Sequence, residues 1–119
     1  MDKIIEICCG SYYDAKEAAI GGAKRIELNS ALNLGGLTPG LSTLELVKDN
    51  LELKVIAMVR PRGAGFCYLD EDFQVMLKEC EALMKSGADG IAFGCLNEDY
   101  TLDLAKNKAM REIIKRYHG

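Results

Sequence analysis

The chain has 119 residues, 49% of them hydrophobic and 28% charged, a balance typical of a globular protein that forms one domain over residues 1–119. Its net charge of −3 excludes the field of clustered Lys and Arg that attracts nucleic acid or an anionic membrane. No stretch reaches the roughly 20 apolar residues that span a bilayer, and the apolar start "KIIEICC" carries Glu6 at its centre, unlike a signal peptide. We therefore expect a cytoplasmic protein with no nucleic-acid and no membrane partner.

The first half of the chain predicts two strands and two helices in alternation. Residues 3–9 form the first strand, and a helix follows over residues 11–20, where Ser11 and Asp14 resemble a capping box. Residues 24–29 form the second strand. The segment "SALNLGGLTPG" is a loop by its glycines and proline, and the next helix starts at Thr38-Pro39 or at Ser42 and ends at Asn50.

The second half repeats the same alternation. Residues 53–59 are almost continuously apolar, as in strands covered on both faces. The segment 71–87 gives the clearest helix, because apolar residues recur at three- and four-residue spacing until Gly87. Residues 89–94 form the fourth strand, and the last helix spans about residues 103–117.

Four strand-helix units predict an α/β fold with parallel strands, because parallel neighbours need a crossover helix between them. Such a (βα)4 unit is either a small open sandwich or one half of a TIM barrel. The strands carry charged residues at Glu6, Arg25 and Glu27, with apolar residues on the opposite face. A helix-covered face does not accommodate these charges, whereas a barrel lumen does, so we expect a TIM-barrel-like (βα)4 half barrel.

Charged residues cluster at the carboxyl ends of the predicted strands, where ligands bind in parallel α/β folds. Arg60 shares a strand face with Met58, and on the lumen side it would meet Glu6 and Glu27. Arg62 lies in a loop with two glycines, suited to binding a small anion. The alternatives are an internal salt-bridge network for Arg60 and a solvated loop charge for Arg62.

Five cysteines without C-x-x-C spacing indicate free thiols rather than disulfides or a zinc ribbon. Cys8 and Cys9 are neighbours on a strand and point to opposite faces, so they do not chelate one ion together. A soft-metal site would pair one of them with Cys67, Cys95 or Met58. No Ser/His/Asp or Cys/His arrangement can be assembled, so catalytic residues stay unknown.

Several segments, in this order and spacing, resemble the amino-terminal half of the CutC family of copper homeostasis proteins. They are "IEICCGS", "GGAKRIELN", "GGLTPGLSTLELV", "VIAMVRPRGAGFCYLDEDF" and "GADGIAFGCLNEDYTLD". The resemblance implies a cytoplasmic TIM barrel with Glu6, Glu27, Arg60 and Arg62 at its cleft. It also implies copper as the metal, bound by cysteine thiols of which Cys8 is one. In the copper-binding reading, Cys67 or Cys95 supplies a further thiolate for Cu(I).

Two departures from the family pattern bear on function. The second strand reads "ELN" where some members carry "ELC", and the amide of Asn29 is not a soft ligand. A complete barrel of this kind has about 250 residues, and the chain is shorter. It lacks the family's second half with its "FHRAFD"-like motif. We expect that two chains associate as a homodimer that rebuilds a barrel, or that this chain is a fragment of a longer one.

Three functions remain open from the sequence. The first is copper homeostasis through copper binding by cysteine thiolates. The second is a barrel enzyme of unknown reaction that binds a small anionic substrate through Arg60 and Arg62, with Glu6 or Glu27 as the acid or base. The third is an inactive, truncated half barrel.

Overall fold

A computed structural model describes residues 3–118 and contains four strands that alternate with four α-helices. The strands are β1 (Glu6–Cys9), β2 (Arg25–Leu28), β3 (Lys54–Met58) and β4 (Gly90–Ala92). The helices are α1 (Tyr12–Ile20), α2 (Leu41–Asn50), α3 (Asp70–Lys85) and α4 (Leu104–His118), and a short 3-10 helix, η1 (Leu32–Leu34), follows β2. The predicted order of strands and helices is confirmed.

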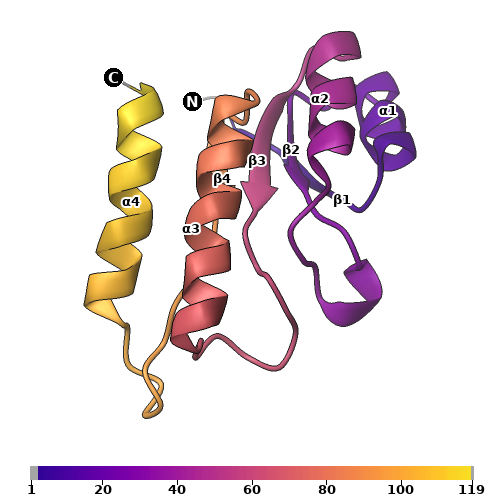
Figure 1. Ribbon diagram of the computed structural model, residues 1–119. Coiled ribbons are helices and arrows are strands. Elements are labelled where there is room, and N and C mark those ends of the chain that lie inside the picture. Colours follow the sequence, from indigo (N-terminus) through magenta and orange to yellow (C-terminus); the bar gives the residue numbers. More distant parts are fainter. Residues whose placement is uncertain (1–2, 119) are drawn as a thin grey trace.

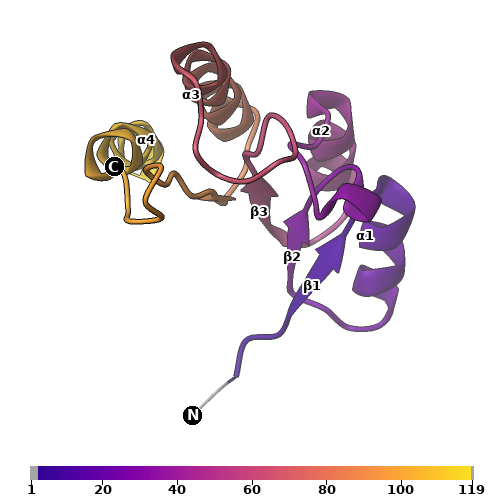
Figure 2. The same cartoon turned by 90° about the horizontal axis from the view of Figure 1, so that it is seen from below.

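The strands form one parallel sheet in the order β1-β2-β3-β4, so each strand pairs with its neighbours in sequence. All the helices lie on one side of this sheet, and α4 packs beside α3 at its far end (Figures 1 and 2). The opposite face carries no helix within residues 3–118. This arrangement confirms the prediction of a TIM-barrel-like (βα)4 half barrel with parallel strands.

The hydrophobic core fills the space between the sheet and the helices. Most strand positions that face the helices carry fully buried side chains, as do the inward faces of α2 and α3, although Ile7 on β1 is 39% exposed. The fully buried residues are Ile26, Leu28, Val55, Ala57, Leu44, Val47, Met76, Cys80 and Leu83. The alternating positions of β1 and β2 are polar or charged and remain partly exposed on the uncovered face. The sheet therefore has one face built for packing and one face lined by functional groups.

The capping pattern at Ser11 positions α1 directly behind the end of β1. Ser11 is the N-cap of α1, and its side-chain oxygen accepts a hydrogen bond from the amide of Asp14 at 3.1 Å. Asp14 in turn accepts a hydrogen bond at 2.9 Å from the amide of Gly10 rather than from the cap residue itself. The first bond satisfies an amide that the first helical turn leaves unpaired, and the second fixes Gly10, the residue after β1, to that turn.

At the amino-terminal ends of the strands, Asp89 connects three segments. Its carboxylate accepts hydrogen bonds from the Lys48 ammonium group at 2.7 Å and from the Val55 amide at 2.9 Å, and the Lys54 ammonium group lies 3.8 Å away. The loop before β4 is thereby fixed to β3 and to α2. The helices within residues 3–118 include none with the length and apolarity needed to cross a membrane.

Candidate functional site

The uncovered face of the sheet brings Cys8 and Glu27 together, because these residues are register partners on β1 and β2. Asn29, just after β2, is 3% exposed and connects them: its amide nitrogen lies 3.1 Å from Glu27 Oε1 and 3.5 Å from Cys8 Sγ. The amide thus donates a hydrogen bond to the carboxylate and a weaker one to the sulfur. Cys8, Glu27 and Asn29 form one polar cluster at the carboxyl ends of the strands.

The loop that follows η1 lies directly on this cluster. Gly36 has a φ of +96°, and a Cβ atom there would come within 2.5 Å of Asn29 Oδ1. Only a residue without a side chain allows this approach, because the contact is too close and the backbone conformation is left-handed. The glycines of the segment 35–36 therefore let the loop press Asn29 against Cys8 and Glu27.

The environment of Cys8 opposes ionisation of its thiol. Partial burial raises the pKa of Cys8, and the negative charges of Glu27, Glu6 and Asp14 raise it further. The thiol is therefore protonated at neutral pH, and a metal that binds to it has to displace the proton.

Glu6 has a different partner from the one expected from the sequence. Its Oε1 lies 2.9 Å from Nε of Arg25, its register partner on β2, and both side chains are about one third exposed, 30% and 34%. The distance is that of an ion pair, although the Arg25 Nε–H group makes no hydrogen bond. Arg25 thus takes the place that the sequence interpretation gave to Arg60, because it is adjacent to Glu6 across a single strand spacing.

Arg60 follows β3 and is oriented by the loop after β2. Its Nη1 donates hydrogen bonds to the carbonyl oxygens of Leu34 at 2.9 Å and Gly36 at 3.2 Å, and its guanidinium lies over the ring of Phe66, 5.1 Å from the centroid. The backbone of Arg60 is paired with Thr38 in both directions. Its Nε is buried and has no hydrogen-bond partner in the described part of the chain. Arg60 is therefore held on one side, while its other edge is free.

Arg62 is enclosed by the loop that it begins. Its Nε lies 3.1 Å from Asp72 Oδ2, and its Nη1 donates to the carbonyls of residues 63, 64 and 65. Its Nη2 donates to the carbonyl of Cys67 at 2.8 Å, and the ring of Tyr68 lies 4.6 Å below the guanidinium. Most of the donors of Arg62 are used inside the protein, so a ligand would have to compete with the loop for this side chain.

The predicted thiol ligands are in two different environments. Cys8 and Cys67 are exposed, whereas Cys95 is fully buried and burial raises its pKa to about 11. No group of three His, Cys, Asp or Glu side chains within residues 3–118 is arranged to hold a metal ion. A metal site that combines Cys8, Cys67 and Cys95 remains a prediction, since the described residues do not bring these three thiols together.

The carboxyl ends of β3 and β4 carry two adjoining hollows. One, of about 330 Å³, is lined mainly by apolar side chains, among them Met58, Phe66, Phe93 and Leu96. The other, of about 450 Å³, shares Phe66 and Leu96 with the first and adds Cys67 and Tyr100. The Arg60 guanidinium lies over Phe66, so a ligand in the first hollow would have an apolar floor with a cation beside it.

Sequence reasoning did not identify three residues that shape this face. The sequence interpretation treated Asn29 only as a residue that replaces a cysteine, but in the structure its side chain connects Cys8 with Glu27. Asp72 and Tyr68, which hold the Arg62 guanidinium, lie 10 and 6 residues further along the chain. An acid and an aromatic residue shortly after a glycine-rich Arg loop are a signal, but a weak one without coordinates.

The comparisons with known proteins point to one family. The family model described as "CutC family" matches residues 3–119. A CutC family protein of Treponema denticola is 51% identical over 111 residues, which are 93% of this chain and 45% of the relative. A human protein named "Copper homeostasis protein cutC homolog" is 42% identical over 100 residues, covering 84% of this chain and 37% of the relative. The chain thus spans less than half the length of these relatives.

Two solved structures share the fold. A crystal structure titled as the putative copper homeostasis protein CutC from Streptococcus agalactiae superposes with a TM-score of 0.87 at 22% identity, over 94% of this chain and 55% of that one. The thiamine phosphate pyrophosphorylase of Pyrococcus furiosus gives a TM-score of 0.64 at 20% identity, over 98% of this chain and 50% of that one. At these identities the two structures establish the fold alone.

Proposed function

The chain belongs to the CutC family, and from that premise we propose that it contributes to copper homeostasis by binding Cu(I) through the thiolate of Cys8. The observation that carries the proposal is the position of Cys8, an exposed thiol at the carboxyl end of β1 on the uncovered face of the sheet. Relatives named as copper homeostasis proteins support the role. The five free thiols agree with the reducing cytoplasm, which we propose as its location.

The residues around Cys8 fit Cu(I) only in part. Soft thiolates select Cu(I), and Cys8 supplies one, but Asn29 beside it offers an amide, which is a poor ligand for this ion. Cys9 is buried on the opposite side of β1 and cannot turn toward the same ion. If Cys8 supplies one thiolate ligand, a second coordination position of Cu(I) is left for another thiol. That thiol is either a small soluble one or Cys67 after a movement of its loop.

The test is a competition titration of Cu(I) between the reduced protein and a coloured Cu(I) chelator. Cys8→Ser is expected to weaken binding at least about tenfold, a loss of about 1.4 kcal/mol or more. Cys67→Ser distinguishes the two sources of the second thiol: a loss in both variants assigns that position to Cys67, and a loss in Cys8→Ser alone assigns it to a small soluble thiol. Unchanged binding in Cys8→Ser, or a loss confined to Cys67→Ser, would overturn the assignment of Cys8.

A second candidate function is the binding of a small anion at Arg60, as in a barrel enzyme of unknown reaction. It is favoured by the buried, unpartnered Nε of Arg60, because Nε and Nη2 form the edge that pairs with a carboxylate or a phosphate group. The Nη1 contacts with Leu34 and Gly36 orient that edge before any ligand arrives. Glu27 lies on the same uncovered face and is the candidate acid or base.

Millimolar phosphate or acetate is then expected to raise the melting temperature of the wild type by a few degrees, through preferential binding to the native state. Arg60→Lys keeps the charge and removes the two-pronged edge, so its melting temperature should not respond. An equal response in both proteins contradicts a site at Arg60. If neither Cu(I) nor an anion changes the stability of the wild type, the chain behaves as the inactive half barrel.

A further inference from the structure

The chain from the end of η1 to α2 holds Arg60 at its backbone and at its guanidinium. The carbonyl groups of Leu34 and Gly36 accept hydrogen bonds from Nη1 of Arg60, and Thr38 binds the backbone of the same residue. Gly35 approaches the guanidinium closely: its φ is +89°, and a Cβ atom there would lie 3.1 Å from Nη1. The path of this loop therefore determines where the Arg60 side chain points.

Thr38 is the residue of this loop that is bound to the end of β3. Its amide donates a hydrogen bond to the carbonyl of Arg60 at 3.1 Å, and its hydroxyl oxygen accepts one from the amide of Arg60 at 2.9 Å. These two bonds fix the backbone of Arg60 just beyond the last residue of β3, Met58. A side chain without an oxygen atom at position 38 would leave the Arg60 amide without this partner.

Glu79, on α3, sets the direction of the Thr38 hydroxyl. The hydroxyl donates a hydrogen bond to Glu79 Oε1 at 3.0 Å, and since it has one proton, its lone pairs are left for the Arg60 amide. Partial burial raises the pKa of the Glu79 carboxyl, and the hydrogen bond from Thr38 offsets part of this rise. Within residues 3–118 no Lys, Arg or His forms an ion pair with Glu79. A partly buried carboxylate without a counter-charge adds little to stability, so its contact is better explained by what Thr38 holds.

This network lies among the inner elements of the fold. β2 and β3 each pair with a strand on both sides, and α3 packs against both α2 and α4. Ser30, which follows β2, adds a further contact, because its hydroxyl donates to the Thr38 carbonyl at 2.7 Å and its backbone pairs with Leu37. The position of Thr38 is therefore fixed from β2, β3 and α3 together.

The Arg60 guanidinium has one edge that these contacts orient but do not occupy. Nη1 is bound to the loop, whereas Nε is buried and has no hydrogen-bond partner within residues 3–118. Nε and Nη2 form the edge that binds a carboxylate or a phosphate group. A freely moving arginine loses side-chain entropy when it binds an anion, and this loss weakens binding. An arginine that is already oriented avoids most of that loss.

We propose that Thr38 and Glu79 are positioning residues of an anion site at Arg60. Glu79 orients the Thr38 hydroxyl, and Thr38 joins the strand end to the loop that fixes the guanidinium. This inference rests on the anion-binding function proposed above for Arg60, and neither positioning residue contacts the anion. If Thr38 only closed the loop, its loss would lower stability and leave the guanidinium unchanged.

The test follows the Nε–H group of Arg60 by NMR, with Arg60→Lys to assign its signal. Thr38→Val keeps the branched shape and removes the hydroxyl, so the order parameter of this Nε–H group is expected to fall. Titration with inorganic phosphate should show an affinity at least about fivefold weaker, as when only one fifth of the molecules hold Arg60 in the binding conformation. Thr38→Ser keeps the hydroxyl and is expected to restore both the order and the affinity.

Two substitutions of Glu79 provide an independent pair. Glu79→Leu removes the acceptor of the Thr38 hydroxyl and is expected to weaken phosphate binding by about twofold, since the hydroxyl keeps its contact with the Arg60 amide. Glu79→Gln keeps an acceptor oxygen and should behave like the wild type. Should Thr38→Val fail to fold, this pair decides, because leucine is a good helix former at this position of α3.

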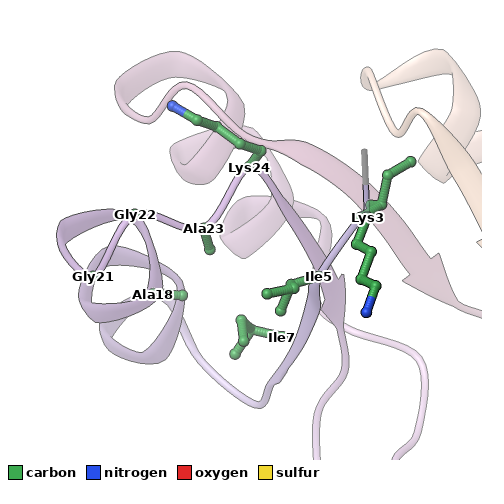
Figure 3. A pocket seen from close by; sticks show the side chains of 9 residues that line it. Lys3, Ile5, Ile7, Ala18, Gly21, Gly22, Ala23 and Lys24 are labelled. Carbon is green, nitrogen blue, oxygen red and sulfur yellow. The ribbon is translucent and has the colours of Figure 1, made fainter. Parts of the chain in front are cut away.

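A control for stability alone lies at the opposite ends of the strands. A hollow of about 460 Å³ between β1 and the end of α1 has apolar walls at Ile5, Ile7 and Ala18, with Lys24 at its rim (Figure 3). Lys24 precedes β2, whereas Arg60 follows β3, so the two lie at different ends of the sheet. Ala18→Gly should lower the melting temperature through its poor helix propensity, without changing the Arg60 signal or the phosphate affinity.

An unchanged order of the Arg60 Nε–H group in Thr38→Val overturns the proposal, because the variant then resembles Ala18→Gly and Thr38 has a structural role only. A wild type that does not bind phosphate rejects the anion site itself, which is a separate result. In that case the order of Arg60 in Thr38→Val and in Thr38→Ser still decides whether Thr38 positions the side chain.

Discussion

Replacing Arg62 by alanine is expected to lower the free energy of unfolding by about 2–3 kcal/mol, because several charge-assisted hydrogen bonds are lost together. The Arg62 guanidinium binds the carbonyls of residues 63, 64, 65 and 67 and pairs with Asp72. The figure is well below the sum of the separate bonds, because the side chain is still 32% exposed and water replaces part of what is lost. Urea unfolding of the two proteins measures the difference.

The shape of the loop explains why Arg62 matters so much. Ala64 and Gly65 both have left-handed backbones, with φ values of +63° and +84°, and this turns successive carbonyls toward the guanidinium. For Ala64 that conformation costs roughly 1 kcal/mol or more, which the Arg62 contacts offset. Without them the loop is expected to relax, and amide hydrogen exchange in residues 63–67 should accelerate.

Arg62→Lys is the matched control for this prediction. Lysine keeps the positive charge near Asp72 but cannot reach four carbonyls with a planar fork. We expect it to retain only a minor part of the stability that alanine removes. If Arg62→Lys were as stable as the wild type, charge alone would account for the effect, and the enclosing loop would have no special role.

Asp89→Asn is expected to lower the free energy of unfolding by about 1–2 kcal/mol at pH 7, because it weakens bonds to a charged donor. Burial alone would raise the pKa of Asp89, but hydrogen bonds from Lys48 and the Val55 amide, with the charges of Lys48 and Lys54, outweigh it and lower the pKa. A lowered pKa in the folded state means that the carboxylate stabilises the protein above its unfolded pKa. This stabilisation is lost as the pH falls through the lower, folded value.

The difference between wild type and Asp89→Asn should therefore be constant near neutral pH and shrink below about pH 4, the ordinary range of an aspartate. Thermal unfolding at several pH values between 3 and 7 measures it. Asp49→Asn is the control, since Asp49 is an exposed carboxylate on α2. A difference that persists unchanged at pH 3 would show that Asp89 acts through shape rather than through its charge.

Together, these two predictions separate the opposite ends of the half barrel. Asp89 joins segments at the amino-terminal ends of the strands, where a barrel carries its stabilising contacts. Arg62 shapes the loop at the carboxyl ends, where Phe66 and Cys67 line the two hollows. Loss of Asp89 should lower stability without altering Cu(I) or anion binding. Loss of Arg62 should lower the stability and also alter ligand binding, because the loop that carries the lining residues moves.

The sequence by itself determined the order of elements and the fold class. Apolar spacing in residues 71–87 and alternation around Glu6 and Glu27 are local properties, and a strand or helix responds to them directly. The same alternation separated Cys8 from Cys9 and placed Glu6 and Glu27 opposite the apolar face, and in the structure Cys8 shares the uncovered face with Glu27. The sequence did not determine where each strand starts. The first strand was predicted from Lys3, but β1 begins at Glu6, which pairs with Arg25, the first residue of β2.

Only the tertiary structure decided which charged groups meet. Glu6 pairs with Arg25 because the strand register places them side by side. Arg60 instead donates hydrogen bonds to the carbonyls of Leu34 and Gly36, in a loop whose course could not be predicted from the sequence. Arg62, expected to be free for a ligand, is enclosed by its own loop. Strand register and loop path depend on contacts between residues far apart in the chain, and a long side chain binds whichever acceptor those contacts bring within reach.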